Sequence, residues 1–157
     1  MGVLYDYFRA ADDATVLELM EKLEGGPIVT GEGTGVDAID FKGIDPGVAL
    51  GQLVAFALNV PWDVDLVSDE LVWPSEEEAE EGEGAIVTRL PDSVRDVLAA
   101  ITPDQVPQLA QQWVGIEEFA GYDDTDEEFC AGGIEEVAGL AQRARDHGEH
   151  LYCWCSL

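Results

Sequence analysis

The chain has 157 residues, of which 34 are acidic and only 7 are basic, so its formal net charge at pH 7 is −27 and its pI is about 4.1. Hydrophobic residues make up 46% of the chain, which excludes disorder for lack of apolar side chains, and the length suits one domain with its own core. A surface this negative would repel nucleic acid and anionic membranes, so direct binding to either is not expected.

The sequence shows no recognisable targeting signal, and together with its cysteine usage this predicts a cytoplasmic protein. The sequence has no apolar run of about 18 residues that could span a membrane, and its opening stretch lacks the basic segment of a signal peptide. Cys130, Cys153 and Cys155 are an odd number of cysteines, which suits a reducing compartment better than a disulfide framework. We therefore expect one acidic domain over residues 1–157.

The first third of the chain predicts two helices and one short strand. Residues 12–24 repeat apolar side chains at the i, i+3, i+4, i+7 spacing of an amphipathic helix. Residues 36–41 form a weak strand pattern. Asp45 followed by Pro46 is a helix-start signal, so a second helix is expected to run to about residue 59.

The rest of the chain mixes strand and helix patterns. Strand patterns cover residues 63–67, 70–73, 85–90 and 151–157. A Glu- and Gly-rich segment, residues 75–84, predicts an exposed acidic loop that closes a hairpin. Helix patterns cover residues 92–101, about 106–119 and 125–147, with a capping box before the second and a potential break at Gly132 and Gly133 in the third. This order predicts an α+β fold, a small single domain with helices packed on a short, mostly antiparallel sheet.

Two long segments, residues 43–88 and 96–142, contain many acidic residues and neither lysine nor arginine. Charge runs of this kind are commonly solvated surfaces that keep a protein soluble, for example in a salty cytoplasm. They are also suited to docking a basic partner, whose association would be accelerated by electrostatic steering. Tryptophans beside these segments are candidates for core packing or for anchors of such a partner.

Residue groupings that could carry catalysis or bind zinc are weak. His147, His150, Cys153 and Cys155 lie within nine residues, but they lack the paired C-x-x-C spacing of a structural zinc site. Cys130 with one of the two histidines is the plausible nucleophile–base pair, yet acidic neighbours would raise the pKa of its thiol. No cofactor is expected.

A cation site is the better of the chemical alternatives. Asp124, Asp126 and Glu128, with Glu135 at the twelfth position counted from Asp124, echo the oxygen-ligand spacing of a calcium loop, although Phe129 stands where such a loop has glycine. The carboxylates between Asp123 and Glu128 could instead form a looser, weaker calcium or magnesium site. Acidic residues at this position also suit the start of a helix, where they offset the positive end of the helix dipole.

The two ends of the chain resemble a known family. At the start, Met1-Gly2, Tyr5 and Tyr7 precede an acidic helix, and near the end a helix through residues 140–144 is followed by a Gly148-Glu149 turn and the apolar strand at residues 151–154. These features are similar to the YfbM-like family of small bacterial proteins of unknown function. The family's Ile-Asp element is present as Ile44 and Asp45, but the Trp and His that usually follow it are absent. The resemblance implies a compact α+β fold, and no catalytic residue is carried over.

The sequence therefore predicts a non-catalytic acidic interaction protein of the bacterial cytoplasm. It would bind a basic protein partner in the manner of an immunity protein, an antitoxin or a nucleic-acid mimic. The predicted partner-binding residues are Trp62, Asp63, Asp65, Trp73, Glu76, Glu77, Glu78, Trp113, Asp123, Asp124 and Asp126. The alternative is a divalent-cation-binding protein or small hydrolase that uses the carboxylate cluster between Asp123 and Glu128.

Overall fold

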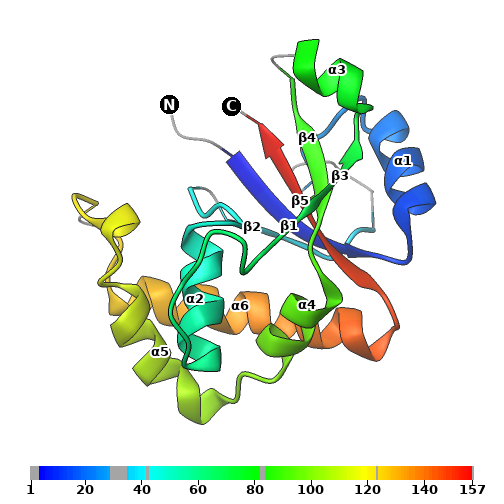
Figure 1. Ribbon diagram of the computed structural model, residues 1–157. Helices are drawn as coiled ribbons and strands as arrows, with labels where there is room; N and C mark the ends of the chain where they lie inside the picture. Colours follow the sequence, from blue (N-terminus) through cyan, green and yellow to red (C-terminus); the bar gives the residue numbers. More distant parts are fainter. Residues whose placement is uncertain (1–3, 29–34, 42, 82–83, 123, 157) are drawn as a thin grey trace.

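The computed structural model of the chain describes residues 4–28, 35–41, 43–81, 84–122 and 124–156. Its strands are β1 (Leu4–Ala10), β2 (Ala38–Asp40), β3 (Glu70–Trp73), β4 (Ile86–Arg89) and β5 (His150–Ser156). They form one antiparallel sheet in the order β2-β1-β5-β4-β3 (Figure 1). The helices are α1 (Asp13–Lys22), α2 (Ala49–Leu58), α3 (Glu76–Glu81), α4 (Asp92–Ala99), α5 (Val106–Trp113) and α6 (Glu127–Asp146), with short 3-10 helices η1 (Pro103–Gln105) and η2 (Glu117–Phe119). This arrangement confirms the predicted α+β fold.

The first and last strands form the centre of the sheet. β1 and β5 pair along their whole length, from Leu4 opposite Ser156 to Ala10 opposite His150. The sequence pattern predicts β5 but not β1, because three consecutive residues of β1 are buried and the strand lacks a clear polar alternation. The predicted hairpin is confirmed, since β3 pairs with β4.

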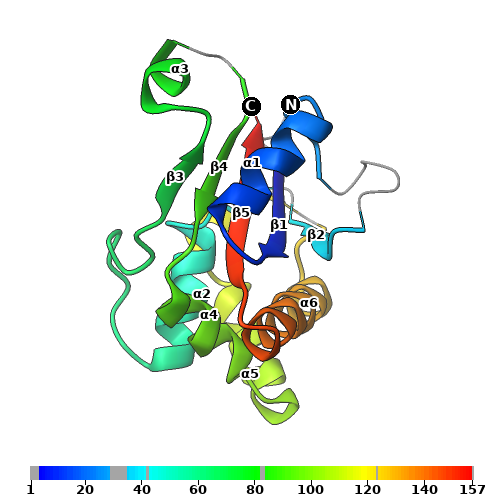
Figure 2. The same cartoon turned by 90° about the vertical axis from the view of Figure 1, so that its right-hand side faces the viewer.

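Helices cover both faces of this sheet (Figures 1 and 2). Tyr7 and Cys153 belong to the larger core, which also contains residues of α2, α4, α5 and α6. Phe8 and Tyr152 belong to the smaller core, whose helical residues come from α1. Because successive residues of a strand point to opposite faces, the apolar strands β1 and β5 supply both cores at once.

The long helix α6 continues without interruption through Gly132 and Gly133, so the predicted break is wrong. Its N-cap is Asp126, whose Oδ1 accepts the backbone N–H of Phe129 at 2.8 Å. Gly133 allows close packing, because a β-carbon at this position would lie only 3.2 Å from the ring of Phe41. The glycine therefore lets α6 approach the end of β2 closely.

The segment at residues 63–67, predicted as a strand, is a turn. Asp63 Oδ1 accepts the backbone N–H of Asp65 at 2.8 Å, and the Asp63 carbonyl accepts the N–H of Leu66 at 3.0 Å. These local bonds compete with strand pairing. The helix predicted to reach residue 119 is also shorter. α5 ends at Trp113, and after Gly115 and Ile116 the chain forms the separate 3-10 turn η2 at Glu117–Phe119.

The acidic segment after β3 contains a short helix rather than only a loop. Ser75 begins it: its carbonyl accepts the N–H of Ala79 at 2.9 Å and its hydroxyl accepts the N–H of Glu78 at 3.3 Å. Carboxylates in a first helical turn offset the positive end of the helix dipole, which favours α3 despite its charge. The predicted exposure of Glu76, Glu77 and Glu78 is confirmed.

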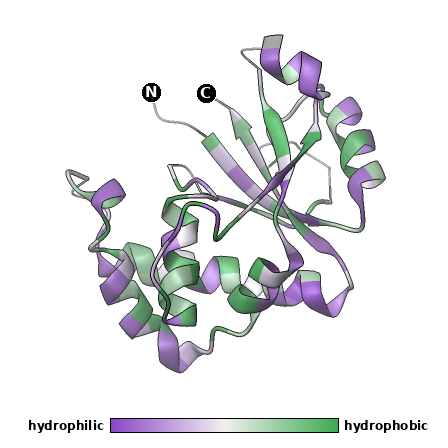
Figure 3. Cartoon of the chain, viewed as in Figure 1, coloured by the Kyte–Doolittle hydropathy of each residue, from purple (hydrophilic) through white to green (hydrophobic). Residues whose placement is uncertain are grey.

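Hydropathy follows this packing (Figure 3). α3 is hydrophilic over most of its length, whereas α2, which contributes to the larger core, is mostly hydrophobic. Within the described part of the chain, no helix combines the length and the apolar character that a membrane span requires.

Candidate functional site

The arginines are all used in ion pairs with the chain's own carboxylates. The pairs are Arg9 with Asp37 and Glu149, Arg89 with Asp13 and Glu70, Arg95 with Asp92 and Asp96, Arg143 with Asp37, and Arg145 with Asp146. The chain has 34 acidic residues and only 7 lysines and arginines, so its cations cannot neutralise most of its carboxylates. Their charge faces solvent or a binding partner.

Trp62 is the predicted anchor that the structure leaves most accessible, with 41% of its surface exposed. Its indole Nε1 donates to the Gly47 carbonyl at 3.2 Å, just before α2. A β-carbon at Gly51 would lie 2.9 Å from the same nitrogen, so the indole packs directly on α2. Trp62 is thus held in one position while part of its ring stays open to solvent.

The chain around Trp62 is an exposed surface of mixed apolar and acidic character. Asp63 and Asp65 are both exposed, as predicted. The surface, here termed the Trp62 segment, spans residues 58–65 and includes the exposed apolar residues Leu58, Val60 and Val64. Such an arrangement provides an anchor surrounded by negative charge.

The second acidic segment adjoins the Trp62 segment at α2. Gln52 Nε2 donates to Glu118 Oε2 at 2.7 Å, so η2 lies beside α2. The neighbouring residue Gly51 belongs to the same turn of α2 and contacts Trp62. Glu118 of η2 and Trp62, which directly precedes Asp63, therefore contact neighbouring residues of α2. Sequence spacing alone did not indicate this proximity.

Two of the predicted tryptophan anchors are packed into the protein. Trp113 is fully buried, and its Nε1 donates to the Ala49 carbonyl at 2.9 Å, so its predicted role as an anchor is wrong. It packs edge-on against Phe119 in the larger core. Trp73 is partly buried against the smaller core and lies close to Gly25. Apolar residues of amphipathic helices are buried whatever the charge of their neighbours, which explains Trp113.

The remaining predicted residues do not form one surface. Glu76, Glu77 and Glu78 lie on α3 at the far end of the β3–β4 hairpin, well separated from the start of α6 (Figure 1). Asp124 and Asp126 are exposed near that start, and Asp126 is occupied as the N-cap of α6. Asp123 lies outside the described residues.

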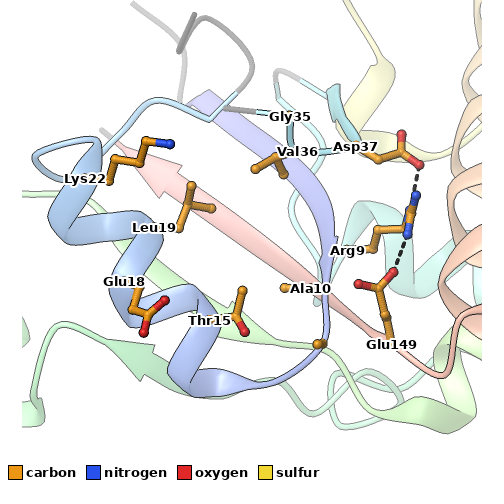
Figure 4. A pocket seen from close by; sticks show the side chains of 11 residues that line it. Arg9, Ala10, Thr15, Glu18, Leu19, Lys22, Gly35, Val36, Asp37 and Glu149 are labelled. Atoms are coloured by element: carbon orange, nitrogen blue, oxygen red, sulfur yellow. Dashed lines mark hydrogen bonds and ion pairs between the residues drawn. The ribbon is translucent and has the colours of Figure 1, made fainter. Parts of the chain in front are cut away.

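A pocket of about 340 Å³ lies between α1 and the β1–β2 side of the sheet (Figure 4). Arg9 stands on one wall between Asp37 and Glu149 and bonds to both, while Glu18 and Lys22 lie on α1 across from it. Hydrogen bonds from Arg143 and Arg9 lower the pKa of Asp37. Asp37 and Glu149 are thus both ion-pair partners of Arg9. Because Asp37 precedes β2 and Glu149 precedes β5, these ion pairs link β1 to the starts of both strands.

The cysteines are not activated as nucleophiles. Burial, with the negative charges of Asp126 and Glu127, raises the pKa of Cys130 to about 11. Burial likewise raises the pKa of Cys153 well above its ordinary value. At neutral pH both groups are therefore thiols with weak nucleophilicity.

The histidines hold structural positions. His147 Nδ1 lies 2.7 Å from the Arg143 carbonyl at the end of α6, and His150 Nδ1 lies 2.6 Å from Asp92 Oδ1. Ser68 lines a small pocket together with His150 and Asp92, which are the residue types of a hydrolytic triad. Within the described residues no hydrogen bond joins Ser68 to His150, so the three side chains do not form the hydrogen-bonded chain of a triad in this structure.

The described residues also contain no grouping of three or more His, Cys, Asp or Glu side chains that is placed to hold a metal ion. No protein-family model matches the chain, and no curated protein or solved structure matches it. The resemblance to the YfbM-like family therefore stays a prediction.

Proposed function

We propose that this chain is a non-catalytic acidic interaction protein that binds and covers a basic protein partner. The observation that carries the proposal is the distribution of charge: the arginines are all paired within the molecule, whereas among the described residues no ion pair engages Asp63, Asp65 or Glu118 near Trp62. Desolvating such carboxylates against a neutral surface would be costly, so a complementary partner carries lysines and arginines.

The Trp62 segment is the proposed centre of the interface. Interfaces draw most of their binding energy from a few aromatic or arginine residues near the centre, and flanking charges contribute mainly to association rate and specificity. Trp62 is already fixed against Gly47 and Gly51, so little side-chain freedom would be lost when a partner covers it. Asp63, Asp65 and Glu118 would surround it with negative charge.

Proteins of this chemistry include immunity proteins, antitoxins and nucleic-acid mimics, all of which occlude a basic functional surface of another protein. We propose a cytoplasmic location, because three free cysteines suit a reducing compartment. The alternative cation site between Asp123 and Glu128 has less support, because one carboxylate oxygen of Asp126 already accepts the backbone N–H of Phe129 as the cap of α6.

The test is affinity capture from host lysate at low and moderate salt, followed by mass spectrometry and by titration with the purified partner. We expect one stoichiometric basic protein, released by salt. Trp62→Ala should weaken its binding at least about tenfold, and the pair Asp63→Asn with Asp65→Asn should reduce the association rate and its salt dependence.

The matched control carries Glu21→Gln on α1 and Glu24→Gln in the turn that follows α1, where both residues are exposed. It has the same change of net charge as the Asp63 and Asp65 pair but leaves the Trp62 segment intact. Equal loss of affinity in the two double variants would show that total charge, and not this surface, governs binding. Full affinity in Trp62→Ala would remove Trp62 as the anchor.

A further inference from the structure

A hollow of about 320 Å³ lies where the C-terminal ends of α2 and α4 meet η1. The two helices pack side by side (Figure 1). Ala57 and Leu58, the last two residues of α2, line the hollow on one side, and Ala100 and Ile101, which directly follow α4, line it on the other. All of its lining residues belong to the described part of the chain.

The walls of the hollow are mainly aliphatic. Val97 of α4 completes them, and the two polar lining residues are Asp96 and Gln105. Leu58 and Ala100 are exposed, so the aliphatic surface is open to solvent. Leu58 also belongs to the Trp62 segment, so a partner that covers Trp62 reaches the hollow as well.

The helix ends favour a cation in this position. The C-terminal end of a helix carries a partial negative charge. At the end of α2 the Asn59 N–H donates to the Phe56 carbonyl at 3.1 Å. The next carbonyl, that of Ala57, would bond to residue 61 if the helix continued, but residue 61 is Pro61 and has no N–H. Among the described residues no donor is bonded to the Ala57 carbonyl.

The cations of the surrounding helices are already paired with carboxylates. α2, α4 and η1 together contain one lysine or arginine, Arg95, which lies 3.0 Å from Asp96 Oδ1 and 3.5 Å from Asp92 Oδ1. Both hydrogen bonds from Arg95 to Asp96 go to Oδ1, so neither of them uses Oδ2. The two arginines of α6, which packs against α4, are paired as well: Arg143 with Asp37 and Arg145 with Asp146.

We propose that this hollow receives a lysine side chain of the basic partner; this inference rests on the proposed function. The four-carbon stem of lysine would lie on the aliphatic walls while its ammonium group stays at the rim. There the ammonium would donate to the Ala57 carbonyl and to Asp96 Oδ2. An aliphatic residue of the partner would fit the same walls, but it would remove both oxygens from water without supplying a donor, which is costly.

The probe is n-butylammonium, which has the stem and the charge of a lysine side chain. Methylammonium keeps the charge without the stem, and n-butanol keeps the stem without the charge. NMR of the aliphatic methyl groups that line the hollow, at fixed ionic strength, measures the binding of each probe. We expect n-butylammonium to bind at least about threefold more tightly than either control. Equal binding of either control, or shifts spread over other methyl groups, would overturn the proposal.

A variant locates the site. Ala100→Leu fills the hollow from the exposed end of α4, and it should abolish n-butylammonium binding and weaken partner binding at least about fivefold. The matched control Ser93→Leu places the same side chain on α4 at an exposed position outside the hollow, and it should do neither. Thermal unfolding checks that both variants fold. The three probes are compared on the native protein, so they decide the proposal even if a variant is unstable.

The same measurements separate this inference from the proposed function. If the partner's affinity falls with Trp62→Ala but not with Ala100→Leu, the partner does not use the hollow, and this inference is wrong while the proposed function stands. If no basic protein is captured at all, the proposed function fails. The n-butylammonium titration then still decides whether the hollow recognises a lysine side chain.

Discussion

Arg143 of α6 and Asp37, which precedes β2, form an ion pair with Nε and Oδ2 2.5 Å apart, although 106 residues separate them in sequence. Asp37 also accepts Arg9 Nε at 2.8 Å, so one carboxylate ties the last helix to the central strand β1 and to the sheet edge. In a molecule of such negative charge, two of the few cations are thus committed to one position.

Replacing Asp37 should destabilise the fold in a pH-dependent way. Arg143 and Arg9 lower the pKa of Asp37 below its ordinary value of 3.8. Its stabilising contribution is therefore complete above that value and is lost as pH falls through the lower folded-state pKa. We expect Asp37→Asn to cost about 1 kcal/mol at neutral pH. The difference in Tm between the native protein and the variant should shrink towards zero in strong acid; a difference that persists there would contradict this assignment.

Trp113→Phe separates packing from binding. The change removes the donor to the Ala49 carbonyl and leaves a small cavity, so it should lower the free energy of unfolding by about 2 kcal/mol. Denaturant titration measures that loss. Under conditions where the variant is fully folded, its affinity for a basic partner should equal that of the native protein, because Trp113 is buried.

The exposed helix α3 tests whether acidic residues distant from Trp62 contribute to binding. Changing Glu76, Glu77 and Glu78 to Gln should weaken partner binding about fivefold and flatten its salt dependence. A control with Glu18 and Glu21 of α1 and Glu24 of the turn that follows it changed to Gln alters the net charge equally. Unchanged affinity in the α3 variant would remove α3 from the interface, and equal losses in both variants would indicate a non-specific charge effect.

The rate at which each cysteine is alkylated should fall as its thiol becomes more buried. With a pKa near 11, Cys130 should react with iodoacetamide only slowly in mildly alkaline solution and speed up as the pH approaches that value. Cys155 is only partly buried and should be alkylated before Cys130 and the buried Cys153. Peptide mass spectrometry after timed quenching measures the order. Rapid modification of Cys130 at neutral pH would reopen the possibility of a cysteine nucleophile.

Asp126 should matter for helix stability and not for calcium. Asp126→Ala removes the N-cap of α6 and should cost about 1 kcal/mol, whereas Asp126→Asn retains a capping oxygen and should cost little. Thermal unfolding at fixed ionic strength, with calcium or with a chelator, should give the same loss for Asp126→Ala. A saturable calcium-dependent rise in Tm that disappears in both variants would favour the cation-binding alternative.

Local signals in the sequence located many elements of the fold. The amphipathic pattern predicts α1 with Asp12 or Asp13 as its cap, and in the structure Asp12 Oδ1 accepts the Thr15 N–H at 2.8 Å. Capping and periodicity are determined by neighbours in sequence, so they can be recognised without the tertiary structure. The turn at Asp63 was misassigned, because its alternation of apolar and acidic residues imitates an edge strand.

The candidate interface depends on contacts between distant parts of the chain. The hydrogen bond from Gln52 to Glu118 joins segments separated by more than sixty positions. Acidic composition predicted the charge of the candidate interface, whereas only packing decides which tryptophan is exposed. Trp62 and Trp113 have similar acidic surroundings in sequence and opposite burial in the fold.

The central position of β1 and β5 has a consequence for biosynthesis. Residues 4–10 emerge early from the ribosome, but their partner at residues 150–156 is made on the order of ten seconds later. During this delay Tyr7 and Phe8, which are fully buried in the finished protein, have no sheet to enter. Over this interval the large negative charge would make neighbouring nascent chains repel one another. This repulsion would protect the unfinished protein from aggregation, in addition to the effect of the charge on the surface of the folded protein.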